Sequence, residues 1–152
     1  MEKNMGKMPH IQLSDELSVA YAVLPGDPER VARAAGFLEN AKELAFHREY
    51  RSVMGTFEGM NVLFLSTGMG GPSTAIAVEE LAKNGVKAAI RIGSCGALQP
   101  ELNLGDLVLV SGAVRDDGAS RAYVPAQYPA IPDFGLLSAC RHSAREAGFS
   151  WH

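Results

Sequence analysis

Three apolar segments of this sequence each run directly into a glycine-containing loop, and this recurrence constrains the fold more than any other feature. The loops read PGDPER, TGMGGPS and GSCGA. Near-continuous apolar runs are typical of strands buried on both faces of a sheet. The first two loops also contain helix-start signals. Asp27 and Pro28 suit an N-cap and a first helical position, and Pro72 opens a second helix. Alternation of strand and helix predicts an α/β fold.

The rest of the chain extends this pattern. Further strands are expected on either side of a turn at residues 58–61, over residues 87–93 and over residues 104–114. Residues 115–132 read as a loop, and a last helix should run from Asp133 to Gly148. We therefore predict a mixed, mainly parallel central sheet flanked by helices.

The expected organisation is a single domain over residues 1–152, with residues 1–12 as a flexible N-terminal arm. The chain stops directly after the last predicted helix, at a point where another buried strand would be natural. We therefore expect the domain to be partial, cut short at its C-terminal side.

Composition excludes several classes of protein. Fourteen basic against 17 acidic residues give a net charge of −3, which argues against a general nucleic-acid surface. We find no signal peptide and no apolar run of membrane-spanning length. Cys95 and Cys140 form no CxxC or zinc-binding pattern. A cytoplasmic protein without nucleic-acid or membrane partners is expected.

The loops point to an anion. Ligands of open α/β sheets bind at the carboxyl ends of strands, where loop and helix-start N–H groups favour negative charge. Arg30 lies one turn into the first helix. Arg91 lies among apolar residues of the strand before the third loop, and a buried cation is costly unless paired. Both side chains are therefore candidate anion ligands.

Other interpretations of the same residues are weaker. GMGGPS resembles a dinucleotide fingerprint, but Ser73 replaces its last glycine. Ser94 or Cys95 suggests a nucleophile, yet no nearby base is identifiable. Arg48 and His10 alone would be ordinary surface residues.

Taken together, the segments PGDPER, HREYRS, STGMGGPSTAIAVEEL, RIGSCGALQPELNLGD and VRDDGAS, in this order and spacing, closely resemble the nucleoside phosphorylase family. The resemblance is closest to its uridine phosphorylase branch and covers nearly the whole chain from Pro9. It implies a pentosyltransferase that cleaves a nucleoside, uridine first, with inorganic phosphate to give free base and ribose 1-phosphate. It implies no organic cofactor.

The resemblance also assigns roles to residues. Phosphate would contact Gly26, Arg30, Arg91 and Ser94, with Arg48 supplied by a neighbouring subunit. Arg30, Arg91 and Ser94 are the expected catalytic residues. The nucleoside would contact Cys95, Gly96 and a neighbour's His10. A potassium ion at a dimer interface would use Glu49, Ser73 and the Met69 carbonyl. The implied assembly is a hexamer built from dimers.

Two alternatives stay open. RIGSCGA and the early PHI resemble the hexameric purine nucleoside phosphorylases, so the base is unsettled. The resemblance also implies that the base-reading residues would lie beyond residue 152. The chain could therefore be an inactive fragment that binds only phosphate or nucleoside.

Overall fold

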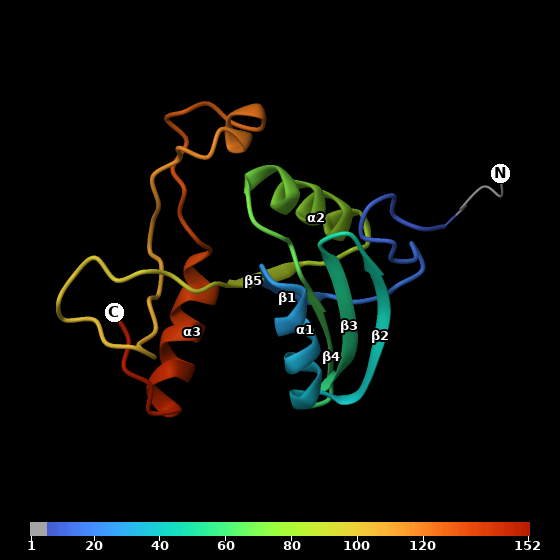
Figure 1. Ribbon diagram of the computed structural model, residues 1–152, viewed down its shortest axis with the longest axis horizontal. Helices are drawn as coiled ribbons and strands as arrows, with labels where there is room; N and C mark the ends of the chain where they lie inside the picture. The colour runs from blue at the N-terminus through green and yellow to red at the C-terminus, as the bar shows by residue number, and fades with distance from the viewer. Residues whose placement is uncertain (1–5) are drawn as a thin grey trace. The chain divides into compact units, whose positions relative to one another are not determined.

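The computed structural model describes residues 6–152 (Figure 1). They fall into two compact units, the first ending at Gly93 and the second running from Ser94 to His152. Within residues 6–152, no helix has both the length and the apolar character needed to cross a bilayer.

The first unit is built on one five-stranded sheet, in the order β2-β3-β4-β1-β5. Its elements are β1 (Tyr21–Pro25), α1 (Pro28–Ala34), β2 (Glu39–His47), β3 (Tyr50–Phe57), β4 (Met60–Leu65), α2 (Gly71–Lys83) and β5 (Ala88–Ile92), with a short 3-10 turn η1 (Ala35–Phe37) after α1. β1 pairs in parallel with β4 and β5, whereas β3 pairs antiparallel with β2 and β4. The predicted mixed α/β architecture is confirmed.

The core of this unit lies against one face of the sheet. Alternation along the strands directs Ala22 and Leu24 of β1, with Leu63 and Leu65 of β4, to that face, and all four are buried. They form one apolar cluster with residues of α2 and of the N-terminal segment. α1 packs instead against β3 and β4 through contacts that include buried Val31. The sheet is thereby fixed between helices, which positions its loops.

The N-terminal segment is folded rather than flexible. Ile11 and Leu13 have exposed fractions of 0% and 1% and belong to the core cluster. The backbone reverses at this point, with Met8 N donating to Leu13 O at 2.8 Å and Asp15 N donating to Gly6 O at 2.8 Å. The sequence prediction of a flexible arm is wrong for residues 6–12, because two apolar side chains bury there; residues 1–5 lie outside the described part.

Two tight turns shape the antiparallel half of the sheet. Glu58 and Gly59 connect β3 to β4, both at positive φ, as the predicted turn requires. Arg48 and Glu49 connect β2 to β3, since His47 pairs directly with Tyr50. Arg48 itself has φ of 56°. The structure thus places Arg48 at the tip of a hairpin.

The second unit contains one long helix, α3 (Phe134–Glu146), and a 3-10 turn, η2 (Ala119–Ala122). Asp133 Oδ1 accepts a hydrogen bond from Leu136 N at 2.8 Å, which is the predicted N-cap. Beyond α3, residues 150–152 run parallel to residues 107–109, with Leu107 N donating to Ser150 O at 2.9 Å. The two segments flanking α3 thus form the start of a parallel ladder.

The strand predicted over residues 104–114 does not form in full. The segment makes isolated bridges at Leu107 and Ala113. A strand requires a neighbouring strand that pairs with its backbone N–H and C=O groups. Within residues 94–152, the segments that pair with residues 104–114 do so over only a few residues. Leu104 and Val114 are almost completely exposed for the same reason.

Candidate active site

Arg91 turns its guanidinium back across the carboxyl ends of β1 and β5. A Cβ placed on Gly26 would lie 3.3 Å from Arg91 Nη2, and one placed on Gly93 would lie 2.8 Å from Arg91 Nη1. Gly26 follows β1 and Gly93 follows β5, so the guanidinium lies directly against both loops. The two glycines leave room for this approach, because any side chain would crowd the guanidinium.

A third loop meets the same place. Gly68 N donates to Gly26 O at 2.9 Å, and Gly68 O would lie 3.3 Å from a Cβ on Gly26. Gly68 has φ of 69°, which a side chain rarely adopts. We call Gly26, Gly68, Arg91 and Gly93 the Arg91 cradle. It places three glycines and a cation at the carboxyl ends of three neighbouring parallel strands, which is where α/β sheets bind ligands.

Arg91 is not the buried cation that the sequence suggested. Residues 89–92 of β5 are exposed, with Ile90 and Ile92 at 37% and 50%. β5 is the edge of the described sheet and has only β1 beside it. The prediction of burial is therefore wrong, while the prediction that Arg91 binds an anion stays a prediction.

The β2–β3 hairpin tip brings Arg48 and Glu49 close to the loop after β4. Ser66 Oγ donates to Glu49 O at 2.6 Å and accepts from Arg51 N at 2.8 Å. A Cβ on Gly68 would lie 2.8 Å from Glu49 Cγ and 3.4 Å from Ser73 Oγ. The structure therefore brings together two of the three predicted cation ligands, Glu49 and Ser73, beside the cradle.

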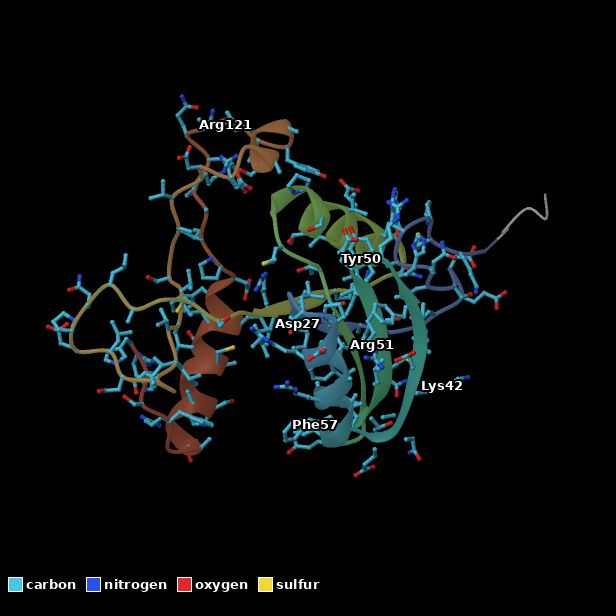
Figure 2. All side chains as sticks on the ribbon, in the orientation of Figure 1. Asp27, Lys42, Tyr50, Arg51, Phe57 and Arg121 are labelled. Carbon is cyan, nitrogen blue, oxygen red and sulfur yellow. The ribbon has the colours of Figure 1, made fainter. Side chains whose placement is uncertain are left out.

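Tyr50 links that region to the start of α2 (Figure 2). Its side chain is 1% exposed, and its hydroxyl donates to Ser73 O at 3.0 Å. Burial raises the pKa of Tyr50, and the negative charges of Glu49 and Glu80 raise it further. The phenol thus stays protonated and neutral between two carboxylates.

The remaining predicted residues are placed as follows. Arg30 lies in the first turn of α1 and is half-buried. Met69 is 97% exposed in the loop before α2. Ser94, Cys95 and Gly96 follow Gly93 in the chain, are exposed, and belong to the second unit. The structure therefore unites Gly26 and Arg91, while Ser94, Cys95 and Gly96 stay predictions.

His10 is held by a carboxylate that sequence reasoning missed. Glu80 is 5% exposed and accepts hydrogen bonds from His10 N at 3.1 Å and Ile11 N at 2.9 Å. His10 Nδ1 lies 2.5 Å from Glu80 Oε1. His47 Nδ1 donates to His10 O at 3.0 Å. Glu80 falls between Ala77, Leu81 and Asn84 on the buried face of α2, and a charge at helical spacing among buried positions was the available signal.

Acid should weaken the anchoring of residues 10–11. Burial alone would raise the pKa of Glu80, but hydrogen bonds from Ile11 N and from His10 outweigh it and lower the pKa below its ordinary 4.5. The stabilisation is therefore complete above pH 4.5 and is lost as pH falls through the lower folded-state pKa. Urea unfolding across this range should show the wild type losing its advantage over Glu80→Gln; a pH-independent difference would contradict the assignment.

Comparisons with known proteins identify relatives of this chain. A sequence profile of the Phosphorylase superfamily matches residues 20–152. A uridine phosphorylase of Thermococcus kodakarensis is 44% identical over 147 residues, covering 97% of this chain and 53% of that protein. A guanosine phosphorylase of Halorubrum lacusprofundi is 41% identical over 134 residues, covering 88% of this chain and 56% of that protein.

A solved structure is similar as well. The crystal structure of uridine phosphorylase from Vibrio fischeri ES114 superposes with a TM-score of 0.94 at 40% identity, covering 98% of this chain and 62% of that chain. The chain thus spans little more than half the length of the relatives it matches. Profile, sequence identity and fold all lead to one conclusion: the chain belongs to the nucleoside phosphorylase family.

Proposed function

We propose that the chain carries the phosphate-binding part of a nucleoside phosphorylase that cleaves uridine to uracil and ribose 1-phosphate. The Arg91 cradle carries the proposal, because it presents a guanidinium and loop backbone to one point at the sheet edge. A guanidinium binds phosphate through two parallel N–H···O bonds. The names of several relatives, including the uridine phosphorylases of Thermococcus kodakarensis and Escherichia coli K12, support uridine as substrate.

In this reaction, a phosphate oxygen forms a bond to C1′ of the ribose as the C1′–N bond breaks. The electron pair of that bond leaves with the base, which takes up a proton. Arg91 and Arg30 would hold the phosphate on one face of the sugar, and Ser94 would complete its contacts. Positioning of the nucleophile is worth several kcal/mol, and its charge stabilises the cationic sugar of the transition state.

Two residues would act on a neighbouring copy of the chain. Arg48, at the β2–β3 tip, would reach a neighbour's phosphate, and His10 a neighbour's ribose 5′-hydroxyl. Cys95 and Gly96 would line the sugar and base pocket of their own copy. We propose that both units form one partial domain of an oligomer, a hexamer assembled from dimers, in the cytoplasm.

The oxygen donors near Gly68 suit a hard monovalent cation such as potassium. Glu49 supplies a carboxylate, Ser73 a hydroxyl and Met69 a carbonyl, and oxygen is the ligand that hard cations prefer. Ser73 Oγ also donates to Gly70 O at 3.1 Å, which leaves its lone pairs for a cation. Three donors are fewer than such an ion takes, so two copies of the chain would share one ion.

A guanosine substrate is the second candidate, favoured by the guanosine phosphorylase of Halorubrum lacusprofundi at 41% identity. Cleavage of uridine and cleavage of guanosine would use the same Arg91 cradle, since both reactions use inorganic phosphate. The choice depends on residues that contact the base.

The direct test is cleavage of uridine and guanosine by the 152-residue chain, with and without inorganic phosphate. We expect uracil and ribose 1-phosphate to appear together, and only when phosphate is present. Cleavage of guanosine alone would select the second candidate. A folded chain that binds phosphate but releases neither base would be a binding fragment rather than an enzyme.

A further inference from the structure

Glu80 makes more contacts with the N-terminal segment than anchoring requires. Its carboxylate accepts from two backbone N–H groups and also lies 2.5 Å from the ring nitrogen Nδ1 of His10. Asn84, the C-cap residue of α2, already fastens the segment, since its Nδ2 donates to Ser14 O at 2.6 Å. The backbone groups use one carboxylate oxygen, Glu80 Oε2, most closely, whereas the short imidazole contact uses Oε1, so the carboxylate has a second role at the ring.

An ionised carboxylate has only acceptor sites, so the His10 nitrogen facing it must carry a proton. In the neutral ring, that leaves Nε2 with its lone pair and no proton. The His10 side chain is 40% exposed, whereas that of Glu80 is 7% exposed. One edge of the imidazole is thus committed to Glu80, while the ring keeps contact with solvent.

The backbone of His10 is equally constrained. His10 O accepts from His47 Nδ1 at 3.0 Å, and Ile11, the next residue, is completely buried. Ring and backbone are therefore fixed from α2 on one side and from the end of β2 on the other. A histidine held in this way is preorganised to accept one hydrogen bond through Nε2.

We propose that Glu80 is a positioning residue that fixes His10 as the Nδ1–H tautomer, so that Nε2 accepts a hydrogen bond from a sugar hydroxyl of the nucleoside. This rests on the proposed function, which gives His10 the ribose 5′-hydroxyl. A hydroxyl can donate to Nε2, whereas a 5′-deoxy sugar cannot. Glu80 thereby contributes to selection of the sugar without touching it.

The tautomer can be measured without any ligand. Nitrogen-15 NMR of the histidine rings in mildly alkaline buffer should show His10 with protonated Nδ1 and unprotonated Nε2. In Glu80→Gln, the amide offers both a donor and an acceptor, so the His10 signals should shift toward a tautomer mixture. Glu79→Gln is the matched control, because it removes the same charge from the neighbouring, exposed position. A wild-type His10 protonated at Nε2 would overturn the proposal even if Glu80→Gln fails to fold.

The sugar contact has its own test, with uridine and 5′-deoxyuridine as probes. Saturating uridine should perturb the Nε2 signal of wild-type His10, and 5′-deoxyuridine should not. In turnover, Glu80→Gln should reduce the preference for uridine over 5′-deoxyuridine in kcat/KM about tenfold, the effect of one hydrogen bond. Glu79→Gln should keep the wild-type preference. An Nε2 signal insensitive to uridine, or an unchanged preference, would overturn the role of Glu80, whereas loss of phosphate dependence would overturn the proposed function.

Discussion

Arg91→Ala will weaken the binding of inorganic phosphate at least about 100-fold, because it removes two charge-assisted hydrogen bonds worth about 1.5–3 kcal/mol each. The reason is geometric. The guanidinium lies against Gly26 and Gly93, so it stands directly at the carboxyl ends of β1 and β5. Calorimetric titration of the folded chain with phosphate measures the loss directly.

Arg91→Lys separates charge from shape. Lysine keeps the positive charge but presents a single ammonium instead of a planar fork, so its affinity should fall between those of wild type and Arg91→Ala. Arg33→Ala is the matched control. Arg33 also lies in the first unit, its side chain is 79% exposed, and its recorded ion pair is with Glu29. Equal phosphate affinity in Arg91→Ala and Arg33→Ala would exclude the cradle as the phosphate site.

Leu63→Ala will destabilise the chain by about 2–5 kcal/mol, the range for truncating a fully buried leucine. Leu63 has no exposed surface and lies on β4, between β3 and β1, within the cluster that also holds Ile11 and Leu13. The cavity would open under the strands that present the cradle. Urea unfolding followed by circular dichroism gives the free-energy change.

Val78→Ala tests whether burial is the cause. Val78 lies on α2 with 48% of its surface exposed, so its truncation should change stability by less than about 0.5 kcal/mol. If both variants unfold at the same urea concentration, the core assignment around Leu63 is wrong.

Local signals in the sequence predicted the helices well. Asp27 and Asp133 cap α1 and α3 as expected, and Asn84 with Gly85 ends α2. These signals work because a helix end depends on its own few residues. The loop glycines were equally informative, because they mark the places where the Arg91 guanidinium lies close to the loop backbone.

β2 was missed because its composition argues against a strand. It reads ENAKELAFH, rich in residues that are depleted from strands, and residues 39–43 are exposed. Register shifts along its pairing with β3 also break the two-residue alternation. Pairing with β3 overrides local preference here, and a single sequence does not display that pairing.

The opposite error occurred at residues 104–114, where an apolar run predicted a strand that forms only isolated bridges. The apolar composition of residues 104–114 indicates that the segment can be buried in a sheet. It does not indicate whether a neighbouring strand is present to pair with it. Glu80 was missed for a related reason. Its role depends on His10, 70 residues earlier, and only the folded chain brings the two together.

The length of α2 sets the distance between the loop that carries Gly68 and the carboxylate of Glu80. The helix begins at Gly71, just after the loop that carries Gly68, and Glu80 lies nine residues further along its 13-residue length. At 1.5 Å per residue, this separates the two points by roughly 13 Å. Figure 1 shows the helix running from the loop end of the sheet toward the N-terminal segment. That length exceeds a ribose. Under the proposed function, it favours a second copy of the chain as the source of the histidine that contacts each sugar.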